Sequence, residues 1–162
     1  MNETEIIEYI TGAFENVEAI SANGDTFFMN DPKKMFPFAT LVTSDFNDTF
    51  SDLNRPGVFR LNIGPGKATF VSLFGPLPAK KAEDGPLPGY NYAALDTLLP
   101  HPVYGRMYWV SILNPSRETF ENRVKPLLAE AYALSANRYA NQTANAEGNS
   151  RRQQAKDDLA DA

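Results

Sequence analysis

Residues 108–113 constrain the fold more than any other stretch of this chain. Every residue in the run is apolar or aromatic except Ser111, and Gly105 before it and Asn114-Pro115 after it bound the run. A short, continuous apolar run between turn residues is typical of a strand that is buried on both faces. We therefore predict a central strand of a sheet at residues 108–113.

Other segments have the pattern of strands around this one. Residues 17–22 and 26–29 flank the turn sequence Asn23-Gly24-Asp25, which predicts a hairpin, and residues 38–43 predict a further strand. In residues 58–63, Phe59, Leu61 and Ile63 alternate with Val58, Arg60 and Asn62, which is typical of a strand with one apolar and one more polar face. We expect the apolar face of this strand to belong to the core.

Helical spacing of apolar residues predicts three helices before residue 100. The first covers residues 4–14, with Asn2 and Glu5 as a capping pair. Two shorter helices are expected at residues 64–73 and 92–99, and Pro100 ends the second of them.

The sequence after residue 113 predicts two more helical segments. Asn114 or Ser116 caps a helix that runs to about residue 124, and Pro126 kinks or restarts it before a helix at residues 127–139. We expect this last helix to bury Leu127, Leu128, Ala131 and Leu134.

This order of elements is segregated instead of strictly alternating. It predicts one α+β domain at residues 1–140, with a mostly antiparallel sheet and helices packed on it. Residues 75–89 form a loop rich in proline and glycine, in which Gly-Pro-Leu-Pro occurs twice; a loop of this length is usually functional or mobile. Residues 141–162 contain one large aliphatic side chain, Leu159, and predict a polar, disordered C-terminal tail.

Composition excludes several classes of function. The chain has no cysteine and one histidine, His101, which excludes thiolate sites and sites with several histidines. Residues 1–140 hold 12 of the 15 basic and 16 of the 20 acidic residues, so the acidic charge belongs to the domain and makes a nucleic-acid or anionic-membrane partner unexpected. No secretory signal and no apolar run of roughly 20 residues occurs, so we expect a soluble cytoplasmic protein. Nothing in the sequence points to a metal or a cofactor.

Two segments carry a resemblance to known families. Residues 55–64 (RPGVFRLNIG) and 101–115 (HPVYGRMYWVSILNP), together with the helix at 127–139, resemble a family of small bacterial, largely actinobacterial, proteins that is known only as a domain of unknown function. More distantly, the layout is similar to the MmcQ/YjbR-like "double wing" proteins. That resemblance implies a YjbR-like fold and DNA binding, which has been suggested for those proteins; the acidic charge and the long loop at 75–89 depart from it.

The candidate site residues lie in the same two segments. His101, held between two prolines, has the rigidity of a positioned general base, or it bonds a backbone group and ends a helix. Arg60 and Asn62 share a strand face, which is either a pocket floor or a solvated sheet face. Tyr104 and Trp109, with Arg106 beside them, either stack a planar ligand or belong to the core.

Two nearby motifs receive a structural interpretation. The residues Asp45, Asp48 and Asp52 predict a capped, solvated turn and not a calcium loop, because a terminal bidentate Glu is missing. Residues 64–69 lack the spacing of a P-loop and predict a tight turn from strand to helix.

Three functions are compatible with these residues. The first is binding of a small molecule or a protein partner at a polar face around Arg60, Asn62, His101 and Tyr104. The second is an enzyme of small-molecule metabolism with His101 as general base, and the third is DNA binding by analogy with the double-wing proteins. The sequence does not decide whether the protein is an enzyme.

Overall fold

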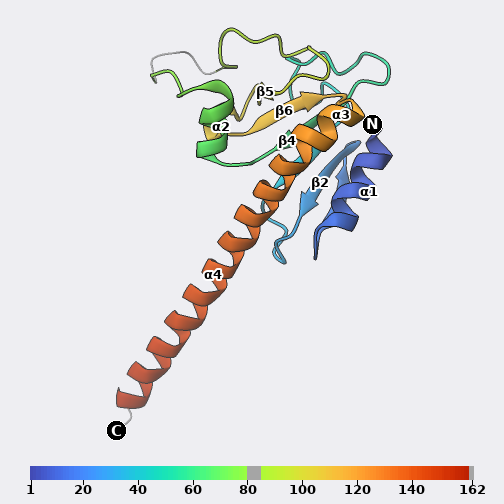
Figure 1. Ribbon diagram of the computed structural model, residues 1–162. Coiled ribbons are helices and arrows are strands. Elements are labelled where there is room, and N and C mark those ends of the chain that lie inside the picture. The colour runs from blue at the N-terminus through green and yellow to red at the C-terminus, as the bar shows by residue number, and fades with distance from the viewer. Residues whose placement is uncertain (80–84, 161–162) are drawn as a thin grey trace.

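The computed structural model describes residues 1–79 and 85–160, and these form an α+β domain with an open, antiparallel, six-stranded sheet (Figure 1). The strand order is β1-β2-β3-β4-β6-β5. The strands are β1 Glu18–Ala22, β2 Asp25–Met29, β3 Ala39–Val42, β4 Arg60–Ile63, β5 Leu99–Pro100 and β6 Val110–Leu113. The helices are α1 Glu3–Ala13, α2 Lys67–Phe74, α3 Arg117–Thr119 and α4 Lys125–Ala160, with a 3₁₀ turn at Gly105–Met107 and a π-helical turn at Phe120–Val124.

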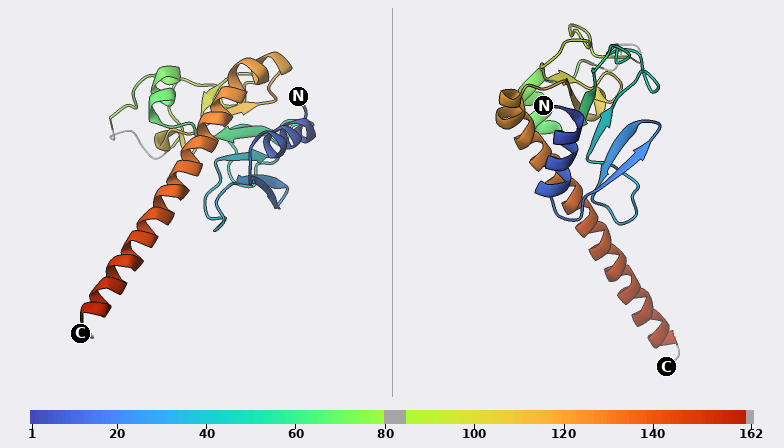
Figure 2. Two further views of the ribbon diagram at one scale, coloured as in Figure 1. Left: turned by 60° about the horizontal axis from the view of Figure 1, so that its bottom comes forward. Right: turned by 90° about the vertical axis from the view of Figure 1, so that its right-hand side faces the viewer.

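The main core lies between one face of the sheet and the helices (Figure 2). Leu61 and Ile63 of β4 point into this core, as the alternation of residues 58–63 predicts. The helices contribute Ile6 and Ile10 from α1, Phe70 from α2, Phe120 and Val124 from the π-helical turn, and Leu127, Leu128 and Ala131 from α4.

The strand register aligns a row of side chains on the opposite face. Phe27 of β2 pairs with Thr40 of β3, Thr40 with Asn62 of β4, and Asn62 with Ser111 of β6. Because side chains alternate between faces along a strand, these four residues lie side by side on the face that the helices leave free. Thr40 and Asn62 of this row belong to the floor of the candidate site, and Phe27 to its wall.

Several predicted elements are confirmed. Asn2 and Glu5 form a reciprocal capping box at the start of α1, with Asn2 Oδ1 accepting from Glu5 N at 2.9 Å and Glu5 Oε2 from Asn2 N at 2.8 Å. The hairpin β1–β2 turns through Asn23 and Gly24, which both have positive φ angles. β4 and β6 lie inside their predicted ranges, and all their residues are buried.

The predicted helix at residues 92–99 is wrong. Asp96 has a left-handed φ of 50°, and its N–H donates to Leu113 O at 2.7 Å, while Leu99 pairs with Ser111 in β5. The backbone of this segment pairs with β6 instead, whose N–H and C=O groups need partners on that side.

The C-terminal helix differs from its prediction at two places. Ser116, one of the two predicted caps, is the N-cap. Pro126 neither kinks nor restarts the helix: the π-helical turn before it is wider and relieves the clash between the proline ring and the preceding turn, so α4 follows without a break. Leu134 is not buried but 41% exposed.

α4 also continues through residues 141–160, where we predicted a disordered tail (Figure 1). Ala, Gln, Arg and Lys in this stretch favour helix without tertiary contacts, and apart from the half-buried Gly148 its residues are all exposed. This exposed part of α4 therefore adds nothing to the core. No helix in residues 1–79 and 85–160 has the length and apolar character to cross a membrane.

Candidate functional site

A groove of about 810 Å³ opens on the sheet face opposite the helices. Its polar lining comes from the sheet and from the loops at 43–57 and 101–109: Thr40, Asn47, Asp48, Arg60, Asn62 and His101. Its walls are mostly apolar and consist of Phe27, Phe36, Pro37, Val42, Val103, Tyr104, Met107 and Trp109, with Arg138 of α4 completing the lining. A concave, mostly apolar site with a few converging polar groups is typical of small-molecule sites, and its volume lies within their usual range of about 300–1,000 Å³.

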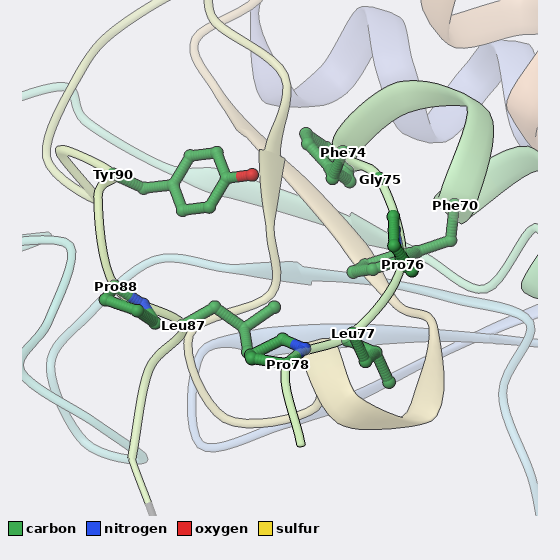
Figure 3. A pocket seen from close by; sticks show the side chains of 9 residues that line it. All are labelled: Phe70, Phe74, Gly75, Pro76, Leu77, Pro78, Leu87, Pro88 and Tyr90. Atoms are coloured by element: carbon green, nitrogen blue, oxygen red, sulfur yellow. The ribbon is translucent and has the colours of Figure 1, made fainter. Parts of the chain in front are cut away.

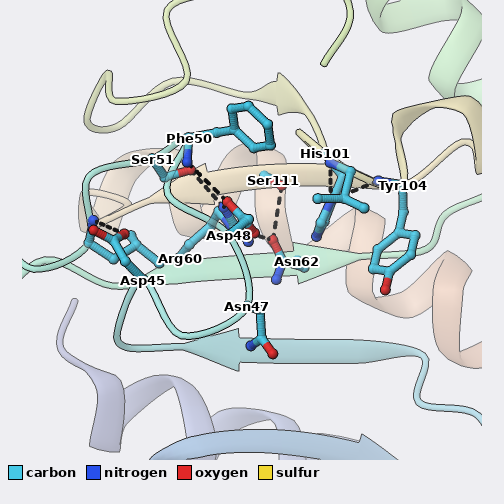
Figure 4. Close-up of polar contacts among 12 residues, drawn as sticks. Asp45, Asn47, Asp48, Phe50, Ser51, Arg60, Asn62, His101, Tyr104 and Ser111 are labelled. Carbon is cyan, nitrogen blue, oxygen red and sulfur yellow. Dashed lines mark hydrogen bonds and ion pairs between the residues drawn. The ribbon is translucent and has the colours of Figure 1, made fainter. Parts of the chain in front are cut away.

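A buried ion pair between Arg60 and Asp48 lies at one end of the floor (Figure 4). The Arg60 side chain is 1% exposed and the Asp48 side chain 6%. Arg60 Nη1 donates to Asp48 Oδ1 at 3.1 Å and Nη2 to Oδ2 at 2.7 Å, which is the bidentate geometry that an arginine and a carboxylate favour. Burial raises the pKa of Asp48, but the hydrogen bonds and positive charge of Arg60 outweigh this effect, so that the pKa lies below its usual value.

Asn62 connects the ion pair to the sheet. Its Oδ1 accepts from Arg60 Nε at 3.0 Å and from Ser111 Oγ at 2.9 Å, and its Nδ2 donates to Thr40 Oγ1 at 3.0 Å. Ser51 adds a further acceptor for Arg60 Nη1 at 2.7 Å. The floor is therefore a fixed network in which each side chain holds its neighbour in place.

His101 is held in one tautomer by its own loop. Its Nδ1 accepts from the backbone N–H of Val103 at 3.0 Å and of Tyr104 at 2.9 Å, so Nδ1 carries no proton. In a neutral imidazole the proton is then on Nε2. Burial lowers the pKa of His101 to about 3, with the positive charge of Arg60 adding to the effect and Asp48 opposing it, so the ring is neutral at pH 7.

The Nε2–H of His101 faces the groove. Nε2 has no hydrogen-bond partner among the described residues. Every fully buried side-chain nitrogen or oxygen of these residues does have a partner, so the unpaired Nε2 must be accessible to solvent. His101 itself lines the groove, so its Nε2–H reaches the open space. It is a hydrogen-bond donor that the fold leaves unused.

The structure brings together five of the six candidate residues from the sequence. Arg60, Asn62, His101, Tyr104 and Trp109 all line the groove. The Tyr104 ring lies 4.9 Å from the His101 ring and is exposed, whereas the Trp109 indole is half-buried against Gly64, where an added Cβ would come within 3.0 Å of the ring. Arg106 is not part of the lining and donates to Pro78 O at 3.4 Å. Whether the five residues bind a ligand stays a prediction.

Other lining residues were not predicted from the sequence. Asp48 was expected in a solvated turn, but the loop at 43–57 folds it over the sheet onto Arg60. Arg60 is buried although it lies on the face opposite the core, and a buried arginine is stabilised by a carboxylate; the aspartates of this loop are the nearest candidates along the chain. Arg138 and Phe36 carry no local signal, because only the tertiary fold places them at the groove.

Two further kinds of site bear on function among the described residues, a metal site and a phosphate cradle at residues 64–69. Within residues 1–79 and 85–160, no three metal-binding side chains come together. At the turn of residues 64–69, the Glu130 carboxylate accepts from Thr69 Oγ1 at 2.7 Å and 2.9 Å and thus occupies the start of α2.

A second hollow of about 170 Å³ lies beside the end of α2 (Figure 3). Both Gly-Pro-Leu-Pro repeats contribute to it, through Pro76, Leu77 and Pro78 and through Leu87 and Pro88. Residues 80–84, between the repeats, lie outside the described residues.

Comparisons with known proteins identify a family but no function. Neither the search of curated proteins nor the search of solved structures returns a match to this chain. The distant resemblance to the MmcQ/YjbR-like proteins therefore stays a prediction. One family model matches residues 1–144, which covers the whole predicted domain. The chain thus belongs to DUF6194, a family of unknown function.

Proposed function

We propose that this protein binds a small organic molecule in the groove opposite the helices. The observation that carries the proposal is the combination of mostly apolar walls with a polar floor that is rigid before any ligand arrives. A preorganised site loses little conformational entropy on binding, which favours affinity for a small ligand.

Exposed apolar side chains at the groove support this proposal. Phe36, Val103, Tyr104 and Met107 are 48–67% exposed, and all four line the same concavity. Large apolar residues gathered around one hollow, instead of scattered singly, are typical of binding sites. A ligand with an apolar or aromatic body would bury them.

The tautomer of His101 favours binding over general-base catalysis. A base needs a free lone pair, but Nδ1 already accepts two backbone hydrogen bonds and Nε2 carries the proton. The low pKa of about 3 also makes the ring a weak base. The ring is therefore suited to donate a hydrogen bond to a ligand.

The single tryptophan of the chain permits a direct test. Trp109 lines the groove, so 3-phenyl-1-propanol is expected to change its fluorescence in a saturable way. Phe36→Ser removes one aromatic wall and should weaken this binding by roughly three- to tenfold, since an aromatic contact contributes about 0.5–1.5 kcal/mol beyond its buried area. Fluorescence titration of wild type and variant measures the effect.

Phe46→Ser is the matched control. Phe46 is also an exposed phenylalanine, at 71%, but it does not line the groove, so its replacement should leave the affinity unchanged. Equal weakening by the two variants would contradict the proposal, as would the absence of a saturable response to both 3-phenyl-1-propanol and 3-phenylpropionate.

A further inference from the structure

Most of the unused hydrogen-bonding groups at the groove floor are donors. The acceptors beside Arg60 are used within the protein: Asn62 Oδ1 accepts twice, and the Asp48 carboxylate accepts from both terminal nitrogens of Arg60 and from Phe50 N. Asn47, in the loop at the edge of the groove, keeps one unused acceptor, because its side chain bonds Asp25 through Nδ2. Unused donors are the Nε2–H of His101 and the second amide proton of Asn62, which take part in no hydrogen bond among the described residues. Such a floor matches a ligand that accepts hydrogen bonds.

The net charge of the lining also favours a ligand that accepts hydrogen bonds, in particular an anion. The charged lining residues are Asp48, Arg60 and Arg138. Asp48 and Arg60 neutralise each other through their bidentate pair. Arg138 is exposed and forms no ion pair within residues 1–79 and 85–160, so the lining has one positive charge in excess, although the chain as a whole is acidic.

We infer that the ligand of this groove is an organic anion, a carboxylate on an aromatic or apolar body, and this inference rests on the proposed small-molecule function. The carboxylate accepts from the unused donors of the floor and is attracted by Arg138. The body packs against Tyr104, Met107, Trp109 and Phe36, which line the walls. An amine would meet one excess positive charge and, at the floor, the unused donors of His101 and Asn62, so a cationic ligand is disfavoured.

Three probes with the same phenyl body and different head groups test the class of ligand. Calorimetric titration with 3-phenylpropionate, 3-phenylpropionamide and 3-phenylpropylamine separates an anion, a neutral acceptor and a cation. We expect the carboxylate to bind about tenfold more tightly than the amide, because hydrogen bonds to a charged group are stronger than those to a neutral one. The amine should bind most weakly.

Arg138→Gln tests the origin of this preference. The variant should reduce the preference for the carboxylate from about tenfold to about two- to threefold. This loss of about three- to fivefold is what an exposed charge pair contributes. In the wild type, high salt should also weaken the preference for the carboxylate, because salt screens the charge of Arg138. Arg151→Gln is the matched control, since Arg151 is an exposed arginine of the same helix that does not line the groove, and the preference should persist.

The outcomes separate the inference from the proposed function. If the amide or the amine binds as tightly as the carboxylate, the anion class is overturned while small-molecule binding stands. If Arg138→Gln and Arg151→Gln lower the carboxylate affinity equally, Arg138 has no local role and the inference is overturned too. If none of the three probes binds while 3-phenyl-1-propanol does, the inference fails and small-molecule binding stands. If 3-phenyl-1-propanol does not bind either, both the proposed function and the inference fail.

Discussion

Replacing Arg60 with alanine is expected to lower the free energy of unfolding by about 3–5 kcal/mol, as is usual when one partner of a buried ion pair is removed. The Asp48 side chain is 6% exposed and would lose its bidentate partner, and Asn62 and Ser51 would each lose the hydrogen bond from Arg60. Urea denaturation at pH 7, followed by circular dichroism, measures the change.

Two control variants identify the cause of this loss. Lys34→Ala removes the cation of an exposed pair with Glu18, whose side chains are 47% and 59% exposed, and should cost at most about 1 kcal/mol. The double variant Arg60→Met, Asp48→Leu removes both buried charges and should recover most of the stability lost in Arg60→Ala. A loss below about 1 kcal/mol in Arg60→Ala would contradict a buried pair, because that is the range of exposed pairs.

Much of the fold could be predicted because local patterns coincide with tertiary roles. The alternation at residues 58–63 assigned Leu61 and Ile63 to the core, and the strand register then placed Arg60 and Asn62 together on the other face. The capping pair Asn2 and Glu5 was likewise readable, because both partners lie within one turn. Where a residue's role depends on neighbours within a few positions, the sequence contains the answer.

The rest of the site depends on contacts between distant segments. Asp48 lies 12 positions from Arg60, in a loop whose Asp, Ser and Thr residues predict a solvated turn, and only the folding of that loop over β4 buries it. The error at residues 92–99 has a related cause, because helical spacing cannot reveal that β6 offers an unpaired edge. Arg138 belongs to the groove through the path of α4, which no local pattern encodes.

Mild acid is expected to destabilise the protein through His101. Its pKa is about 3 in the folded state, below the value of about 6.5 for an unfolded chain. Between these values the unfolded chain binds a proton that the folded protein does not, so lowering the pH favours unfolding. The stability from the neutral ring is complete above pH 6.5 and is lost as the pH falls, at about 1.4 kcal/mol per pH unit. Urea denaturation at pH 7, 6 and 5 should therefore show a loss of about 2 kcal/mol.

His101→Asn assigns this pH dependence to one side chain. Asparagine does not titrate, and its Oδ1 can accept from the N–H groups of Val103 and Tyr104 as Nδ1 does in the wild type. The chain has no other histidine, and the pKa values of Asp48 and Asp96 are already lowered, so they titrate below this range. The variant should be nearly equally stable at pH 7 and pH 5. A wild type that keeps its full stability at pH 5 would mean that His101 binds a proton in the folded state, and the ring could then not be the fixed neutral donor of the groove.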